Sequence, residues 1–337
     1  MDASSAEDGL IDIPLVDLGD RGPLALIDAA PGRFRAIFGA GLKHYGPWFL
    51  KAADGATERW LARADTPYAA EVEAVAARAP SPGARMLNLS YEWSCTTGVG
   101  PSPAGGGNRM LRTLDWPLDG LGRNLVVTRH TGPAGPWVNV TWPGFVGVAT
   151  AMAPGRFSAA INQPPMRRFT GGCWLDWAIE RVRVSRRTGT PPMHLLRRVF
   201  EECRTFEDAQ SMLTETEIAV PAFFSLSGAR ADQGCVIERM ETRAFVRAGG
   251  RAAVANHWVA GGQGGRLRGH DSPGRLALME RTRDGVTGGF GWVDPPILNP
   301  TTRLAVVADA AAGALDVRGY ERDGVVTRDF SLPRLAG

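Results

Sequence analysis

The chain has 337 residues, of which 44% are hydrophobic, and this is enough for one large domain or two small ones with a substantial core. Its 38 basic and 35 acidic residues leave a formal charge of +3, so overall charge does not indicate nucleic acid or an anionic membrane as a partner. The sequence contains no run of about 18 apolar residues, which excludes a membrane-spanning helix.

The cysteines and histidines indicate a reduced protein without a metal centre. The four cysteines form no Cys-x-x-Cys pair and are too sparse for a disulfide scaffold. The five histidines show neither an HExxH motif nor a close ligand spacing, so we expect no metal and no cofactor. Because residues 1–8 are acidic and lack the basic and apolar parts of a secretory signal, we expect a cytoplasmic location.

The first 94 residues are expected to be mainly helical. After an extended start at residues 11–16, apolar residues recur at helical spacing in residues 24–45 and 70–77, with Pro and Gly between them. The pattern changes at Cys95. Alternating or continuous apolar runs with β-branched residues then predict adjacent strands at residues 124–130, 137–142 and 145–152.

The rest of the chain carries both kinds of element. Helical spacing returns at residues 174–184, 193–203 and 206–214. Strand patterns resume near residues 222–226, 234–239, 253–256, 304–309 and 314–320. Strands, then helices, then strands indicate an α+β fold in which helices cover two facing sheets. The glycine-rich residues 261–265 lack the Gly-Lys-Ser/Thr ending of a phosphate-binding loop, so we interpret them as a flexible loop.

Cys95 is the residue that most strongly suggests chemistry. It lies in the sequence Trp-Ser-Cys-Thr-Thr at residues 93–97. Arg112 and Asp115 follow at short range, where a hairpin would bring the chain back beside Cys95. A free thiol has a pKa of about 8.5, so attack on an amide at neutral pH needs a nearby base or cation. If the Ser94–Cys95 bond is cut, the new α-amine, with a pKa of roughly 7.7–8.0, can take the thiol proton. Cys95 would then supply both nucleophile and base; the alternative for Arg112 and Asp115 is an ordinary surface ion pair.

Several segments resemble the acid ceramidase and choloylglycine hydrolase group of N-terminal-nucleophile hydrolases. Besides Cys95 and its neighbours, residues 142–162 contain a strand, a Pro-Gly turn and a strand ending in asparagine, as in acid ceramidases. Further similar segments lie at residues 206–209, 221–224 and 234–237, and two more, residues 11–16 and 86–93, are similar to the shorter subunit of that family. The resemblance spans most of residues 11–320.

This resemblance implies a fold and a processing step. It predicts a four-layer αββα sandwich over residues 95–337, preceded by a mainly helical segment at residues 1–94. Autoproteolysis between Ser94 and Cys95 would turn these two parts into subunits. No cysteine precedes Cys95, so no disulfide can join the subunits, and we expect them to stay associated by packing alone.

The resemblance also implies roles for polar residues around the nucleophile. Arg112 would favour the thiolate, and Asp115 would orient the α-amine. Asn162 and Asn256 would contact the scissile carbonyl and stabilise its oxyanion, although both could instead cap a turn or a strand end.

Two further residues match the family by position. Arg275 resembles a late arginine, although Arg266 and Arg268 lie close to it in sequence. Asp176 matches a glutamate that assists self-cleavage in the acid ceramidase branch, and its side chain is one carbon shorter. Thr113 stands where relatives have an asparagine between the arginine and the aspartate.

Five aromatic residues near these motifs could line an acyl-chain channel, although burial in the core is the commoner fate of such residues. They are Trp116, Trp142, Phe145, Trp174 and Trp177. The resemblance predicts a cysteine amidase that hydrolyses a linear N-acyl amide, of the fatty-acyl amide, ceramide or N-acylethanolamine type, through a Cys95 thioester. Two alternatives stay open: an acyltransferase that passes the acyl group to an amine, and a catalytically silent lipid-binding protein.

Overall fold

Helices dominate the part of the molecule that precedes Cys95. The computed structural model describes residues 9–90 and 93–332, so residues 1–8, on which the expected location depends, lie outside it. The helices are α2 (Pro23–Ala29), α3 (Pro31–Tyr45), α4 (Pro47–Leu61), α5 (Ala69–Arg78) and α6 (Ala84–Leu89). The first three begin at a proline, whose fixed φ suits the first helical position and which has no N–H to leave unpaired.

The first sheet has the order β1-β4-β5-β6-β7-β8-β9-β10. Its strands are β1 (Leu15–Gly19), β4 (Val126–Gly132), β5 (Gly135–Thr141), β6 (Thr150–Ala153), β7 (Phe157–Asn162), β8 (Ala222–Gly228), β9 (Gly234–Arg239) and β10 (Ala244–Ala248). β1 runs parallel to β4, and all other neighbours are antiparallel. Because β1 precedes Cys95, its pairing with β4 joins the two predicted fragments within one sheet.

The second sheet has the order β11-β2-β3-β12-β13-β14, and β15 pairs with β13. Its strands are β2 (Ser94–Pro101), β3 (Asn108–Asp115), β11 (Ala252–Val254), β12 (Thr302–Asp309), β13 (Ala314–Glu321), β14 (Gly324–Val325) and β15 (Phe330–Ser331). Cys95 is the second residue of β2. The pairing of β2 with β3 and of β3 with β12 places the hairpin of residues 94–115 beside a strand that lies almost 190 residues further along the chain.

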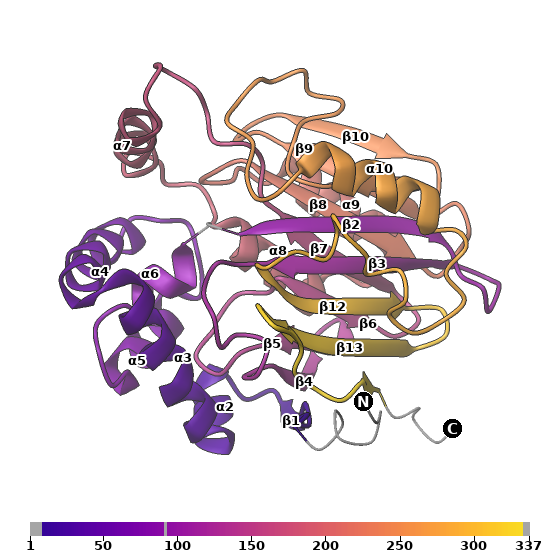
Figure 1. The fold of residues 1–337 in the computed structure, drawn as a ribbon, viewed down its shortest axis with the longest axis horizontal. Helices are drawn as coiled ribbons and strands as arrows, with labels where there is room; N and C mark the ends of the chain where they lie inside the picture. Colours follow the sequence, from indigo (N-terminus) through magenta and orange to yellow (C-terminus); the bar gives the residue numbers. More distant parts are fainter. Residues whose placement is uncertain (1–8, 91–92, 333–337) are drawn as a thin grey trace.

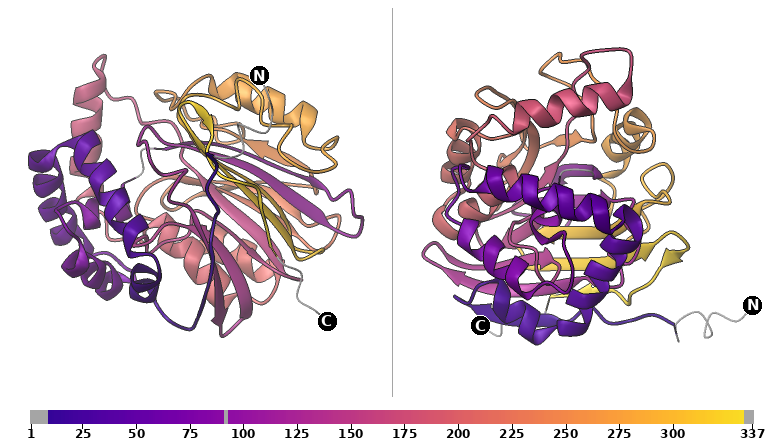
Figure 2. Two further views of the ribbon diagram at one scale, coloured as in Figure 1. Left: turned by 60° about the horizontal axis from the view of Figure 1, so that its bottom comes forward. Right: turned by 90° about the vertical axis from the view of Figure 1, so that its left-hand side faces the viewer.

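The two sheets face each other, and helices cover their outer surfaces (Figure 1). α8 (Pro192–Glu202) and α9 (Phe206–Glu215) pack on the first sheet, and α10 (Ser272–Thr282) packs on the second. Figures 1 and 2 show α2 to α6 at one end of this sandwich and α7 (Cys173–Val184) standing away from it. The four-layer arrangement confirms the predicted α+β fold class, while the division of the chain at Ser94 stays a prediction. No described helix combines the length and the apolar character needed to span a bilayer.

One expected strand is shorter than the sequence pattern suggests. We expected a strand over residues 145–152, but regular pairing begins only with β6. Before β6, the N–H of Val146 donates to Asn88 Oδ1, and the N–H of Val148 donates to the Met193 carbonyl. These backbone groups bond outside the sheet, so an apolar run of strand length is here a buried loop.

Candidate active site

The pairing of β2 with β3 determines which side chains share a face with Cys95. Cys95 lies opposite Leu114, and Thr97 lies opposite Arg112. Because residues opposite each other in an antiparallel pair point to the same face, Arg112 is on the same face as Cys95. Asp115 is three residues further along β3 and therefore points to the other face of the sheet.

The face towards the first sheet holds the thiol in a buried polar cluster. Arg112 donates from Nη2 to Cys95 Sγ at 3.2 Å and from Nη1 to Asn162 Oδ1 at 2.9 Å. The Thr97 hydroxyl donates to the same Asn162 oxygen at 2.7 Å. All four side chains are fully buried. Since Asn162 ends β7, the cluster connects the two sheets across the core.

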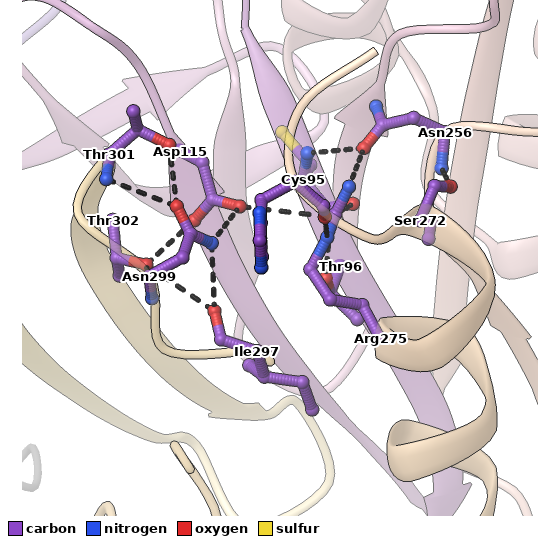
Figure 3. Close-up of polar contacts among 12 residues, drawn as sticks. Cys95, Thr96, Asp115, Asn256, Ser272, Arg275, Ile297, Asn299, Thr301 and Thr302 are labelled. Carbon is purple, nitrogen blue, oxygen red and sulfur yellow. Dashed lines mark hydrogen bonds and ion pairs between the residues drawn. The ribbon is translucent and has the colours of Figure 1, made fainter. Parts of the chain in front are cut away.

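The opposite face of β3 carries a second polar cluster around Asp115 (Figure 3). The Asp115 carboxylate accepts hydrogen bonds from Asn299 Nδ2 at 2.9 Å and from the Thr302 hydroxyl at 3.0 Å. Arg275 on α10 approaches the carboxylate to 3.7 Å. Thr302 lies opposite Asp115 in the pairing of β12 with β3, so the register of the sheet places this donor.

Two residues hold the backbone of Cys95 (Figure 3). Its N–H donates to Asn256 Oδ1 at 2.9 Å, and its carbonyl accepts from Arg275 Nη1 at 2.8 Å. Arg275 Nη2 also donates to Asn256 Oδ1 at 2.8 Å, so these two residues fix each other. The predicted bond of Asp115 is to the α-amine that cleavage would free, and it stays a prediction; in the uncut chain the Cys95 nitrogen contacts Asn256. Asp115 contacts Arg275 from the other face of the sheet.

The amide nitrogens of the two predicted oxyanion donors are engaged with backbone carbonyls. Asn256 Nδ2 donates to Gln163 O at 2.7 Å. Asn162 Nδ2 donates to Val254 O at 3.3 Å and to Ala255 O at 3.2 Å. In the uncut chain these amides therefore link the end of β7 to the end of β11. Their role at an oxyanion stays a prediction.

Burial and neighbouring charges act in opposite directions on the thiol. Burial raises the pKa of Cys95, Arg112 and Arg275 lower it, Asp115 raises it, and the net shift is upward. Burial likewise raises the pKa of Asp115 above its usual value, against the opposing effects of Arg275, Asn299 and Thr302. A thiol with a raised pKa forms little thiolate at neutral pH, so a reaction at Cys95 requires a proton acceptor close to the sulfur.

Asp176 lies outside both clusters, in the first turn of α7. Its carboxylate accepts hydrogen bonds from Arg266 Nε at 2.6 Å and from the N–H groups of Phe169 at 3.0 Å and Thr170 at 2.6 Å. Burial opposes ionisation, but these bonds outweigh it and lower the pKa of Asp176 to about 2. The contacts fasten the chain before α7 to the loop that contains Arg266. The predicted role of Asp176 in self-cleavage stays a prediction.

A hollow of about 730 Å³ lies beside the predicted cleavage point. Its wall includes Ser94 and two of the five predicted aromatic residues, Trp174 and Trp177. Gly269 is also in the wall, with a φ of +67°, and a Cβ atom there would come within 2.0 Å of Ser94 Oγ. Only glycine allows this close approach of the loop to Ser94.

The other three predicted aromatic residues lie in a different place. Trp116, Trp142 and Phe145 line a cavity of about 40 Å³ next to residues of the N-terminal helices. Trp116 and Trp142 are buried, and Trp116 packs edge-on against Trp93 at 5.0 Å between ring centroids. The five residues expected along one channel are therefore divided between the hollow beside Ser94 and the core.

Some polar residues of the site were missed by the sequence analysis. Thr97 had a signal, because strand periodicity places a residue two positions after Cys95 on the same face. No sequence pattern indicated Asn299 or Thr302, since they lie 184 and 187 residues from Asp115 along the chain. No group of three or more His, Cys, Asp or Glu side chains suited to a metal ion occurs in residues 9–90 and 93–332.

Comparison with known proteins shows that part of the chain is similar to acid ceramidases. No family model matches it. Acid ceramidase of Bos taurus is 26% identical over 198 residues, which cover 54% of this chain and 47% of the relative. Acid ceramidase of Homo sapiens is 36% identical over 103 residues, which cover 29% of this chain and 24% of the relative. Over these stretches the chain is similar to the acid ceramidases. The resemblance inferred from the sequence is thereby confirmed, and the chain spans about half the length of the bovine protein that it matches.

A solved structure supports the fold of the chain. The Caenorhabditis elegans orthologue of N-acylethanolamine-hydrolyzing acid amidase superposes with a TM-score of 0.50 and 18% sequence identity. The superposition covers 71% of this chain and all of the other. At this identity the likeness concerns the fold, and it agrees with the two covered sheets described above.

Proposed function

We propose that the chain is a self-processing cysteine amidase that hydrolyses a linear N-acyl amide through a Cys95 thioester. The observation that carries the proposal is that every polar part of buried Cys95 has its own partner. Arg112 contacts the sulfur, Asn256 the N–H and Arg275 the carbonyl. A packed structural cysteine needs no arginine at its sulfur, because a buried thiol behaves as a small apolar group. The relation to acid ceramidases supports the same class of reaction.

The first step would be an attack by Cys95 on the bond that precedes it. The Cys95 sulfur adds to the Ser94 carbonyl carbon, and the C–N bond between the two residues breaks while the nitrogen takes the thiol proton. The product is a thioester of Ser94 on the Cys95 side chain, together with a free α-amine. Water then hydrolyses the thioester and leaves fragments 1–94 and 95–337. Arg112 would stabilise the sulfur anion during the attack.

In each later turnover, the α-amine of Cys95 would act as the base. With a reference pKa of roughly 7.7–8.0, it can take the thiol proton and return it to the leaving amine. Asn256 Oδ1 already lies 2.9 Å from this nitrogen and is placed to orient it. The sulfur attacks the acyl carbonyl, the amine leaves, and water hydrolyses the acyl thioester to the free acid. The hollow beside Ser94 is the space in which the substrate would lie.

Intact mass of the purified protein tests self-processing. The wild-type protein should give fragments 1–94 and 95–337, whereas Cys95→Ala should stay one chain and have no amidase activity. Cys203→Ala is a matched control, because Cys203 is also buried and has a pKa raised to about 12, by burial first. It should cleave like the wild type. Cleavage of the Cys95→Ala protein, or full activity in an uncut wild-type chain, would refute the mechanism.

An assay of amide turnover tests the reaction class. Cleaved protein is incubated with an N-acylethanolamine or a ceramide, with and without a second amine, and the products are separated by mass spectrometry. We expect free fatty acid under both conditions and none with Cys95→Ala. Formation of a new amide in place of the fatty acid would show acyl transfer and would overturn the assignment as a hydrolase.

A further inference from the structure

α10 contacts Asn256 at both its main chain and its side chain. The Asn256 N–H donates to the Ser272 hydroxyl at 2.8 Å, and Asn256 Oδ1 accepts from Arg275 at 2.8 Å (Figure 3). Ser272 begins α10, and Arg275 lies about one turn further along the same helix. One helix therefore holds both ends of the residue that contacts the Cys95 N–H.

Ser272 has a second partner, the imidazole of His257. His257 Nδ1 lies 2.8 Å from the Ser272 oxygen. A hydroxyl has one proton to donate, and the Ser272 oxygen already accepts from the Asn256 N–H. Because Ser272 is buried, its proton needs an acceptor within the protein. His257 Nδ1 is that acceptor, provided that this nitrogen carries no proton of its own.

The surroundings of His257 favour the neutral ring at neutral pH. The side chain is half-buried, and burial lowers its pKa from the ordinary value of 6.5. Two carboxylates, Glu238 on β9 and Glu280 on α10, raise the pKa. Two arginines, Arg275 on α10 and Arg247 on β10, lower it. The net shift is downward, so protonation of the ring requires a pH below about 6.5.

We propose that His257 is a positioning residue of the candidate active site. Its unprotonated Nδ1 holds the Ser272 hydroxyl, Ser272 holds the main chain of Asn256, and Asn256 holds the nitrogen of Cys95. Protonation of Nδ1 turns this nitrogen into a donor and leaves the Ser272 proton without its acceptor. The support of Asn256 then weakens at acidic pH. The effect on reaction rate rests on the proposed function, whereas the chain of hydrogen bonds can be measured in a protein that does not react.

Two substitutions of His257 separate the hydrogen bond from the bulk of the ring. His257→Asn places an amide oxygen near the position of Nδ1, so it keeps an acceptor that does not titrate. His257→Leu removes the acceptor and keeps an apolar side chain of similar size. At neutral pH, His257→Asn should cleave between Ser94 and Cys95 like the wild type. His257→Leu should cleave about tenfold more slowly, as expected for one unsatisfied buried hydrogen-bonding group.

The pH profile of self-cleavage adds a test that a purely structural role would not pass. As the pH falls below about 6.5, the rate of the wild type relative to that of His257→Asn should drop about tenfold, because only the wild-type ring takes up a proton. His44→Asn is the matched control, because His44 is exposed on α3, and its profile should follow that of the wild type.

Imidazole NMR tests the hydrogen bond without any reaction. In uncut Cys95→Ala protein that contains histidine labelled with a heavy nitrogen isotope, the ring signals of His257 are those that His257→Asn removes. They should show an unprotonated Nδ1 at neutral pH and a pKa below about 6.5. In the same uncut protein, hydrogen exchange in residues 94–97 and 255–257 should be faster for His257→Leu than for His257→Asn.

The proposal is overturned if the His257 ring carries its proton on Nδ1 at neutral pH, or if His257→Leu exchanges hydrogen as His257→Asn does. It is also overturned if a wild-type chain that cleaves itself has the same pH profile as His257→Asn. A wild-type chain that stays uncut would refute the proposed function instead, and the ring signals and the hydrogen exchange would still decide the role of His257.

Discussion

The contact of Arg112 with the Cys95 sulfur predicts how self-cleavage depends on pH. Burial raises the pKa of Cys95, and Arg112 is the largest of the influences that lower it. Arg112→Gln removes the charge, and its shorter side chain ends near the position of Nε, so Cys95 Sγ and Asn162 Oδ1 each lose the donor that Arg112 supplies. The thiol of this variant should therefore ionise at a higher pH than that of the wild type.

The size of the effect follows from the geometry. Two unit charges 3.2 Å apart attract each other by about 5 kcal/mol at an effective dielectric constant of about 20. The net contribution of a hydrogen bond to a charged group is smaller, about 1.5–3 kcal/mol. The substitution therefore raises the pKa of Cys95 further. Since about 1.4 kcal/mol corresponds to a factor of ten, the thiolate fraction and the rate of cleavage at neutral pH should fall about 10- to 100-fold.

Timed mass spectrometry after a pulse of synthesis measures the rate at which fragments 1–94 and 95–337 form, across neutral and alkaline pH. The rate of Arg112→Gln should recover as the pH is raised, and Arg112→Lys, which keeps a charge, should lie between this variant and the wild type. Arg183→Gln, on the exposed side of α7, is the control and should cleave normally. If Arg112→Gln is correctly folded and cleaves with the rate and pH profile of the wild type, Arg112 does not stabilise the attacking thiolate.

Three other substitutions or measurements test neighbouring parts of the site. Asn256→Ala leaves the Cys95 N–H without an acceptor and leaves Arg275 Nη2 with only the Arg268 carbonyl at 3.5 Å. A loss of about 1–3 kcal/mol for an unsatisfied buried group should slow self-cleavage at least about tenfold in the same assay. The pKa of Asp176 is about 2 in the folded protein and about 3.9 in the unfolded chain. The ionised carboxylate therefore stabilises the fold at neutral pH. This stabilisation is lost as the pH falls from about 4 to 2. Asp176→Asn should therefore lower the Tm in calorimetry at neutral pH and lower it less near pH 2. After cleavage, both fragments should elute together from a sizing column without denaturant, because β1 pairs with β4 and Glu71 pairs with Arg197 at 2.5 Å; separate elution would contradict this.

The sequence was most informative where a contact depends on neighbours along one strand. The alternation of side chains along β2 and β3 is a local property, so the motif around Cys95 already fixes which residues can face the thiol. The same alternation indicates that Arg112 and Asp115, three residues apart, cannot both face it. The resemblance to acid ceramidases named Asn256 and Arg275 as site residues, which no periodicity could have given. The structure brings both to the backbone of Cys95, and the role of Asn256 at an oxyanion stays a prediction.

The parts that sequence reasoning could not place depend on pairing between distant segments. The donors to Asp115 come from β12 and the turn before it, and only the register of β12 against β3 brings them there. The aromatic residues show a second limit, because composition does not distinguish a buried core ring from one that lines a hollow. Trp142 and Trp174 look alike in sequence, yet one is 3% exposed and the other 84% exposed.

The contacts around Cys95 suggest that cleavage changes the chemistry of the site more than its arrangement. In the uncut chain, Arg112, Asn256 and Arg275 already occupy their positions on the sulfur, the nitrogen and the carbonyl of Cys95. None of these three partners is supplied by residues 1–94. Breaking the Ser94–Cys95 bond turns an amide N–H, which cannot accept a proton, into an amine that can, and Asn256 Oδ1 can bond to either form. Under the proposed mechanism, the polar clusters on both faces of β3 would serve self-cleavage first and substrate cleavage afterwards, with the same residues in the same places.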